Sequence, residues 1–196
     1  MNESNLNINS PDDELINAFT KGDQNAFNLI VRKYQKKVYW TVRKMVLDHD
    51  DADDITQEVF LKLYRSVSEF RGESKFFTYV YKIAINYSLN HLSKNKKILA
   101  RKSDMDNSHI KSHYKSADED MNATEKTRLL EEAIESLPEQ QRAVFNMRYY
   151  DNLSYDEISN IMNKSVGGMK ANYFHAIKKL EKYLKQHKNY EAMEIN

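Results

Sequence analysis

Glycine and proline are unusually scarce in this chain, and no other feature constrains the fold as strongly. The 196 residues include four glycines and two prolines. Proteins built from β-strands normally use many more turn residues than this, and glycine and proline are the residues that most often mark turns. The sequence therefore predicts an all-α fold.

Charge and cysteine content exclude several classes of protein. The net charge is only +1, so any basic surface must come from an uneven distribution of the charges. Without cysteine, the chain can form no disulfide and no thiolate metal site. Residues 1–10 are too polar for a signal peptide, and no apolar run approaches the roughly 20 residues that span a bilayer. We therefore expect a cytoplasmic protein that does not insert into a membrane.

Hydrophobic periodicity divides the chain into two helical blocks joined by a polar segment. Residues 12–93 carry apolar side chains at helical spacing on four predicted helices, and residues 125–188 carry them on four more. Residues 94–124 have too few apolar side chains to offset the entropy of ordering, so we expect a flexible linker there. Residues 1–11 are predicted to be a disordered tail and residues 189–196 a second tail.

The last two predicted helices have the pattern of a helix-turn-helix motif. Ser154 and Glu157 have the spacing of a capping box before a short helix. After residues 163–164, Ser165 can cap a long final helix. The helix-turn-helix motif consists of a short helix, a tight turn and a longer helix.

Basic residues are concentrated on the final helix. From Lys164 onward the lysines are opposed by one acid, Glu181, before the C-terminal tail, whereas acids outnumber bases in residues 125–157. This polarity is expected when only the final helix meets phosphates. The alternative is a solvated helix whose lysines suit the helix dipole. Gly167 and Gly168 favour DNA binding, because glycine in a first turn costs roughly 1 kcal/mol but lets a phosphate approach the backbone.

Several residues off the apolar stripe of this helix have side chains that suit contacts with DNA. They are Gly167, Lys170, Ala171, Phe174, His175 and Lys178. The lysine and histidine can donate to phosphates or base edges, and Phe174 can pack on a thymine methyl group. For Phe174 the alternative is burial in the core.

The fourth predicted helix of the first block has an apolar stripe and a second face opposite it. The stripe consists of Phe76, Val80, Ile83, Ala84 and Tyr87. The second face is a ridge of Tyr79, Lys82, Asn86 and Asn90, and the preceding loop adds Phe70, Arg71 and Lys75. Aromatic, basic and amide groups on one ridge can stack on unpaired bases and bond to their edges. The alternative, which composition alone favours, is a half-buried tyrosine on an otherwise solvated face.

An acidic ridge lies on the third predicted helix. Asp54, Gln57 and Glu58 share one face by their spacing and suit a partner that carries arginines. The alternative is a set of acids that stabilise the helix dipole. A calcium loop starting at Asp48 fails, because its twelfth position is Val59. Since no phosphate loop, nucleophile elbow or ligand-spaced cluster is present, we expect no enzyme activity, no cofactor and no metal site.

These motifs resemble those of extracytoplasmic-function (ECF) sigma factors of bacterial RNA polymerase. Similar to their sigma-two domain are residues 53–62 (DDITQEVFLK), 70–74 (FRGES) and 77–86 (FTYVYKIAIN). Similar to their sigma-four domain are residues 137–142 (LPEQQR), 153–158 (LSYDEI) and 165–170 (SVGGMK). The resemblance implies a protein that binds core RNA polymerase, directs it to promoters and helps to melt the DNA. It also implies an anti-sigma factor as a partner.

The resemblance further implies roles for individual residues. Asp54, Gln57 and Glu58 are expected to face the clamp helices of the largest polymerase subunit. The loop at about 68–75 is expected to capture a flipped base of the minus-ten element. The minus-ten contact set is Phe70, Arg71, Lys75, Tyr79, Lys82 and Asn86. The final helix is expected to read the minus-thirty-five element in the major groove. Its contact set is Lys164, Ser165, Gly167, Gly168, Lys170, Ala171, Phe174, His175 and Lys178.

The chain also departs from the family pattern. The family usually has tryptophan where Tyr79 stands, often proline at Ser165, and arginines at Lys170 and His175. A lysine cannot form the bidentate fork that arginine forms with guanine, so promoter preference cannot be copied from other members. Two other function classes stay open: a stand-alone helix-turn-helix regulator with an N-terminal sensor or dimerisation domain, and a helical adaptor without a DNA role.

Overall fold

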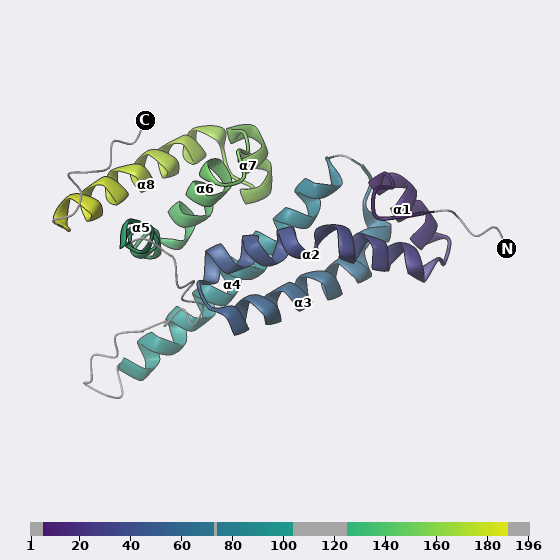
Figure 1. Cartoon of the computed structure of the whole chain (residues 1–196), viewed down its shortest axis with the longest axis horizontal. Helices are drawn as coiled ribbons and strands as arrows, with labels where there is room; N and C mark the ends of the chain where they lie inside the picture. The colour runs from purple at the N-terminus through teal and green to yellow at the C-terminus, as the bar shows by residue number, and fades with distance from the viewer. Residues whose placement is uncertain (1–5, 73, 104–124, 188–196) are drawn as a thin grey trace. The chain divides into compact units, whose positions relative to one another are not determined.

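All secondary structure in the described part of the chain is helical (Figure 1). The computed structural model describes residues 6–72, 74–103 and 125–187. The helices are α1 (Asp12–Thr20), α2 (Gln24–Val46), α3 (His49–Ser66), the short 3₁₀ helix η1 (Val67–Glu69), α4 (Phe76–Ser103), α5 (Glu125–Glu135), α6 (Glu139–Tyr149), α7 (Tyr155–Met162) and α8 (Val166–Gln186). The predicted all-α fold is confirmed. The chain forms two compact units, Met1–His91 and Leu92–Asn196, and each is described by itself.

Local signals set the helix boundaries of the first unit. Gly22 turns the chain after α1 with φ of +100°, a conformation that glycine adopts without strain. The Asp23 carboxylate then accepts a hydrogen bond from the Asn25 N–H at 2.9 Å and caps α2. Asp48 caps α3 in the same way, through the Asp51 N–H at 2.9 Å. Each cap satisfies an N–H that has no partner inside its helix.

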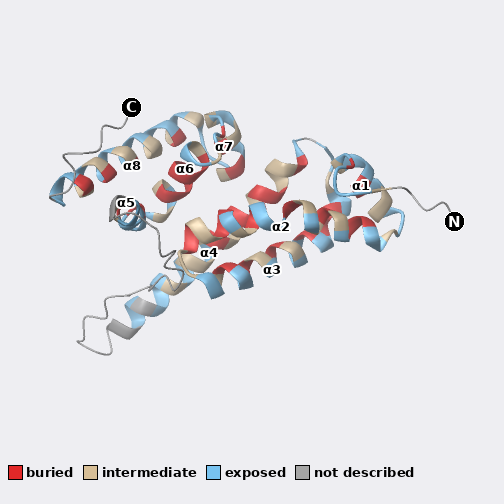
Figure 2. Cartoon of the chain, viewed as in Figure 1, coloured by how far each residue is buried: buried red, intermediate tan, exposed pale blue. Residues whose placement is uncertain are grey.

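The helices of the first unit bury their apolar stripes in a common core (Figure 2). Side chains from each helix are almost fully buried, among them Leu15, Ile30, Val42, Val59, Leu63 and Val80. On α4 the buried surface is broader than the predicted stripe, because Tyr81 and Ile85 are also buried. Tyr87, which the stripe included, is only half-buried. The packing of α4 therefore uses more of its circumference than one amphipathic stripe.

Two segments differ from expectation at the edges of the first block. Residues 6–11 do not form the disordered tail predicted for residues 1–11: the Ser10 N–H donates to the Asn7 carbonyl at 3.0 Å, and Lys33 Nζ donates to the Ser10 carbonyl at 2.8 Å. Helix α4 also continues to Ser103, into the predicted linker. Lysine, leucine, alanine and arginine dominate this extension, and their high helix propensity favours a helix there even without a core. The rest of the linker, residues 104–124, and the tail 189–196 lie outside the described residues.

The second unit packs α5, α6 and α7 against α8. Its core cluster contains Ala133, Ile134, Leu137, Phe145, Ala176, Leu180 and Leu184. Arg142 is buried beside this cluster, where its Nη2 donates to the Glu135 carbonyl at 2.7 Å and satisfies the C-terminal end of α5. Burial lowers the pKa of Arg142, which the nearby Glu135 and Glu139 partly oppose. This arginine connects α5 and α6 and so supports the helices beneath α8.

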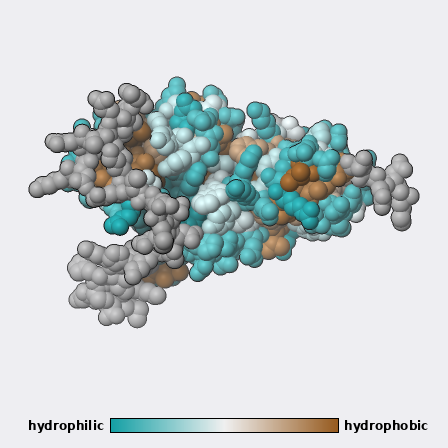
Figure 3. Space-filling model, viewed as in Figure 1, coloured by the Kyte–Doolittle hydropathy of each residue, from teal (hydrophilic) through white to brown (hydrophobic). Residues whose placement is uncertain are grey.

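The face of the described chain that is seen in Figure 3 is mainly polar. Figure 3 shows hydrophilic residues over most of the visible face of the described chain, with hydrophobic residues in small patches. None of the described helices is both long and apolar enough to cross a membrane.

Candidate nucleic-acid and polymerase interface

The turn between α7 and α8 is held by side-chain caps on both helices. Ser154 and Glu157 form the predicted capping box: the Glu157 N–H donates to Ser154 Oγ at 3.2 Å, and the Ser154 N–H donates to Glu157 Oε2 at 2.8 Å. Asn163 ends α7 in the left-handed conformation with φ of 51°. Ser165 Oγ then accepts the Gly168 N–H at 3.1 Å and starts α8. The predicted helix-turn-helix pattern is thus present, with a closely fixed turn.

One whole face of α8 is exposed. The residues on it are Gly167, Lys170, Ala171, Phe174, His175 and Lys178. Phe174 is 57% exposed, so the alternative of a core residue is wrong. Its ring lies 5.7 Å from the His175 ring, and Lys178 Nζ lies 5.8 Å from its centroid. An exposed aromatic ring beside two nitrogen donors suits a DNA surface, because it offers an apolar contact and polar contacts together.

The basic groups at the start of α8 have neighbours that orient them without neutralising them. Lys170 Nζ lies 5.8 Å from the centroid of the Tyr155 ring, and the Arg148 guanidinium lies 5.4 Å from the same centroid. Lys164 Nζ donates to the neutral amide oxygen of Gln140. Since these partners carry no negative charge, the cations keep their charge available for phosphates.

The two glycines in the first turn of α8 differ in the space that a side chain would have there. A Cβ on Gly168 would lie 3.1 Å from Ser165 Oγ, so glycine protects the cap there. A Cβ on Gly167 would have nothing within 4 Å, and the residue is exposed. Packing inside the chain therefore explains Gly168 and leaves Gly167 without an intramolecular reason.

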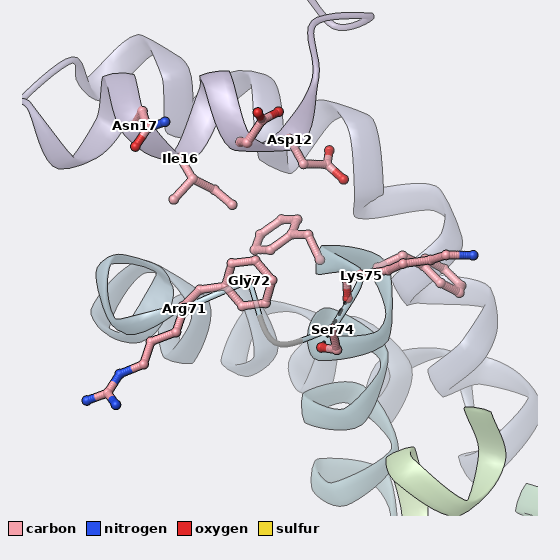
Figure 4. Close-up of a pocket in the computed structure, with 11 residues that line it drawn as sticks. Asp12, Ile16, Asn17, Arg71, Gly72, Ser74 and Lys75 are labelled. Carbon is pink, nitrogen blue, oxygen red and sulfur yellow. Dashed lines mark hydrogen bonds between the residues drawn. The ribbon is translucent and has the colours of Figure 1, made fainter. Parts of the chain in front are cut away.

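The loop before α4 borders an open hollow of about 600 Å³ in the first unit (Figure 4). The loop contributes Phe70, Arg71, Gly72, Ser74 and Lys75 to its lining. Gly72 has φ of +74°, which favours glycine at the tip of the loop. Figure 4 shows the Arg71 guanidinium and the Lys75 ammonium at opposite edges of the hollow, so positive charge flanks it on both sides.

The other wall of the hollow comes from α1, which the sequence analysis missed. Asp12, Asp13, Ile16 and Asn17 line it. Asp12 is held in place by Lys33 Nζ at 2.8 Å and by the Tyr34 hydroxyl, which donates to its carboxylate at 2.7 Å. Burial and this carboxylate raise the pKa of Tyr34, so its hydroxyl stays protonated. No periodic signal relates α1 to a loop so distant in the sequence.

The predicted ridge on α4 is not uniform. Tyr79 is half-buried: its hydroxyl donates to Ser66 Oγ at 2.8 Å, and its ring lies 5.3 Å from the ring of Phe70. Lys82 is also half-buried, whereas Asn86 and Asn90 are exposed. Tyr79 therefore serves packing, as the alternative held, and it connects the loop to the end of α3. Its contact with a promoter base stays a prediction.

The acidic ridge on α3 is exposed at all three predicted positions, Asp54, Gln57 and Glu58. The neighbouring acids have other roles, since Asp48 caps the helix and Asp51 bonds His91 at 2.9 Å. Leu61 extends the ridge and is 58% exposed. Its position one turn after Gln57 and Glu58 was a signal that the sequence analysis left unused.

Comparison with known proteins assigns both units to one family. The family model described as "Sigma-70 region 2" matches residues 30–98, and "Sigma-70, region 4" matches residues 127–180. The ECF RNA polymerase sigma-E factor of Haemophilus influenzae is 35% identical over 179 residues, which cover 87% of this chain and 93% of the relative. The factor of the same name from Escherichia coli K12 is 38% identical over 173 residues, which cover 84% and 90%.

Solved structures agree at the level of the fold. The sigma factor RpoE of Bartonella quintana, solved with the anti-sigma factor NepR, has a TM-score of 0.62 at 20% identity and covers 82% of this chain and 98% of its own. CnrH, solved with the cytosolic domain of CnrY, has a TM-score of 0.64 at 17% identity and covers 90% and 98%. Because both sigma-70 regions follow in order along one chain and the sequence relatives match over almost their whole length, the chain belongs to the ECF family of RNA polymerase sigma factors.

Proposed function

We propose that this sigma factor uses three surfaces: the acidic ridge of α3 for core polymerase, the loop and ridge around α4 for the melted minus-ten element, and the exposed face of α8 for the minus-thirty-five element. The observation that carries the proposal is the pairing of two sigma-70 regions on one chain, each with an exposed surface of matching chemistry. The process needs no covalent chemistry by the chain, and we propose that it is not an enzyme.

The polymerase contact rests on Asp54, Gln57 and Glu58. These side chains are exposed and adjacent on α3, with the apolar Leu61 one turn further on. Such a surface suits the arginine-bearing clamp helices, since charge-assisted bonds to arginine are strong and an apolar neighbour adds buried area.

Promoter opening rests on the loop at residues 68–75 and on Asn86. A flipped base costs a few kcal/mol of stacking, and a site that captures it offsets this cost. The hollow beside Phe70, with Arg71 and Lys75 at its edges, has the chemistry for one unstacked nucleotide: an aromatic wall and two cations for phosphate.

Duplex recognition rests on α8. Lys170, Ala171, Phe174 and His175 are exposed on one face of α8, which suits the base edges of a major groove, and the exposed Gly167 in the first turn suits the approach of a phosphate. These targets lie in the cytoplasm, where we propose that the protein acts. RpoE of Bartonella quintana was solved with an anti-sigma factor, and we propose that a partner of this class regulates the chain.

Charge reversal on α3 tests the proposal. The double variant Asp54→Lys and Glu58→Lys is expected to abolish pull-down of core polymerase and, with it, promoter-dependent transcription in vitro. The matched control, Glu131→Lys and Glu132→Lys on α5, makes the same charge change at exposed positions of the other unit and should retain core binding. Unchanged pull-down of the α3 variant contradicts the clamp assignment. If the chain instead binds a palindromic duplex without polymerase and starts no transcription with it, the stand-alone regulator is favoured.

A further inference from the structure

The outward side of α2 is basic and carries the only tryptophan of the chain. Its sequence has no acidic residue between Gln24 and Val46, and its basic residues are Arg32, Lys33, Lys36, Lys37, Arg43 and Lys44. Lys36, Lys37 and Trp40 are all exposed and lie within one helical turn of one another. We call these three residues the basic face of α2. This face is separate from the three surfaces proposed above.

Trp40 does not serve the core. Its side chain is 49% exposed, whereas Val38, Thr41 and Val42 on the opposite side of the helix are buried. Its ring meets Tyr39 edge to face at 5.3 Å, and the Tyr39 hydroxyl is bonded to His49 Nδ1 at 2.7 Å. The Tyr39 ring is thus held against α3. Trp40 packs against this ring while about half of its own surface stays exposed.

The basic face of α2 adjoins the hollow at the start of α4. Lys37 Nζ lies 5.6 Å from the centroid of the Phe77 ring, and Phe77 lines the hollow together with Arg71 and Lys75. Lys33 is already paired with Asp12, so it adds little free charge. Exposed cations therefore lie both at the hollow, in Arg71 and Lys75, and beside it on α2, although Asp12 and Asp13 also line the hollow.

Single-stranded DNA suits this surface best. Proteins that bind single strands combine a basic track for the backbone with aromatic rings on which bases stack. An acidic protein segment would satisfy the lysines but would not need an exposed indole between them. We propose that the basic face of α2 is a second binding surface for the melted promoter strand, continuous with the loop at residues 68–75. This inference rests on the proposed function, because promoter opening supplies the unpaired strand beside that loop.

Trp40 is itself the probe for the first test. Titration of the full chain with a short oligothymidylate at low salt is expected to quench the intrinsic fluorescence of Trp40, because a stacked base contacts the indole. Measured instead by the fluorescence anisotropy of a labelled oligothymidylate, Trp40→Ala should weaken binding about 5-fold or more, and Trp40→Phe should restore part of it. The double variant Lys36→Gln and Lys37→Gln should lower the slope of log K against log salt by about 1.4, since each single-strand phosphate contact contributes about 0.7.

Controls separate this surface from general charge and from folding. Lys179→Gln and Lys182→Gln remove the same charge from exposed positions of α8 and should leave the quenching of Trp40 unchanged. Thermal unfolding of the Trp40 variants should match the parent within a few degrees, since half of the side chain is in solvent. Absence of quenching at low salt, or unchanged affinity in the Trp40→Ala and double-lysine variants, overturns the inference.

A crosslinking test in the holoenzyme identifies the occupant directly. With p-benzoyl-phenylalanine in place of Trp40, irradiation of an open promoter complex is expected to attach the chain to one melted strand. Attachment to a protein only, whether a polymerase subunit or an anti-sigma factor, overturns the inference. If the promoter still opens in that experiment, the proposed function stands while the inference falls. Failure to open any promoter with the unmodified chain contradicts the proposed function itself.

Discussion

In α8 the side chains that face solvent and those that pack the core lie on opposite sides of one helix, whereas before α4 one partly buried side chain, Phe70, does both. Phe174 lies beside His175 and Lys178, and all three are exposed, while Met169, Ala176 and Leu180 are buried on the other side. Phe70, by contrast, contacts both Phe76 and Tyr79, and it also lines the hollow.

This difference predicts how substitutions on each surface change stability and affinity. A residue on the exposed face of α8 can change without disturbing the fold, so under the proposed function promoter preference can vary there at little cost in stability. Phe70 cannot, because it packs against Phe76 and Tyr79 and is also a proposed DNA contact. We therefore expect variants of α8 to separate affinity from stability and variants of Phe70 to change both together.

Phe70→Ala is the strongest test of whether stability and promoter opening depend on the same side chain. Loss of this ring removes contacts at 5.2 Å with Phe76 and 5.3 Å with Tyr79, so we expect a loss of about 2 kcal/mol in the free energy of unfolding. The melting temperature of the first unit should fall by roughly 10 °C, and permanganate reactivity of the promoter should fall at temperatures where the variant is folded. Asn28→Ala, at an exposed position of α2 outside the proposed surfaces, is the control. Loss of promoter opening at full stability contradicts the linkage.

Phe174→Ala tests whether a residue on the exposed face of α8 changes DNA affinity without changing stability. Because the side chain is 57% exposed, the free energy of unfolding should stay within about 0.5 kcal/mol of the parent. Affinity of the holoenzyme for duplex DNA with its minus-thirty-five element should fall about 5-fold, the value of one apolar contact with a base. Lys182→Ala, on the same helix but outside the contact set, should leave affinity nearly unchanged. A variant with lower stability and unchanged affinity assigns Phe174 to packing instead.

The two regions also differ in how well the sequence predicts them, because one depends on local signals and the other on contacts between distant segments. The end signals of α7 and α8 are local: the Ser154 and Glu157 capping box and the Ser165 cap lie within four residues of the bonds that they make. The exposed face of α8 is the complement of one apolar stripe, so its periodicity is enough to predict it. Both could therefore be read from the sequence.

The site in the first unit depends on contacts between distant segments. Asp12 and Asn17 of α1 line a hollow whose other wall is the loop at residues 70–75, and no spacing rule relates the two. Tyr79 has the position of an exposed ridge residue, but Ser66 of α3 accepts its hydroxyl hydrogen bond and holds it against the bundle. Burial of Tyr81 and Ile85 likewise follows from how α4 packs, which a single stripe cannot predict.

Tyr79→Phe measures how much of the Tyr79 role is structural. The change keeps the ring beside Phe70 and removes the 2.8 Å hydrogen bond to Ser66 Oγ, so we expect a loss of about 1 kcal/mol in stability. Promoter opening at moderate temperature should change little, because stacking area is retained. Ser66→Ala should cost a similar amount, and the double variant should cost no more than the larger single change if the bond is the shared cause. A large opening defect at normal stability would instead assign the hydroxyl to DNA.

Gly167→Ala is the smallest change and the one that separates stability from affinity most cleanly. A Cβ there meets no atom within 4 Å, and alanine is the better helix former, so stability should rise by up to about 1 kcal/mol. If a phosphate approaches the backbone at this turn, affinity for the minus-thirty-five duplex should fall a few-fold in the same variant. Asn28→Ala, at an exposed position of α2, provides a gain in helix propensity without a change in that affinity. A rise in the free energy of unfolding together with a fall in DNA affinity indicates that Gly167 serves a partner outside the chain. A change of both in the same direction indicates that Gly167 matters only for the helix.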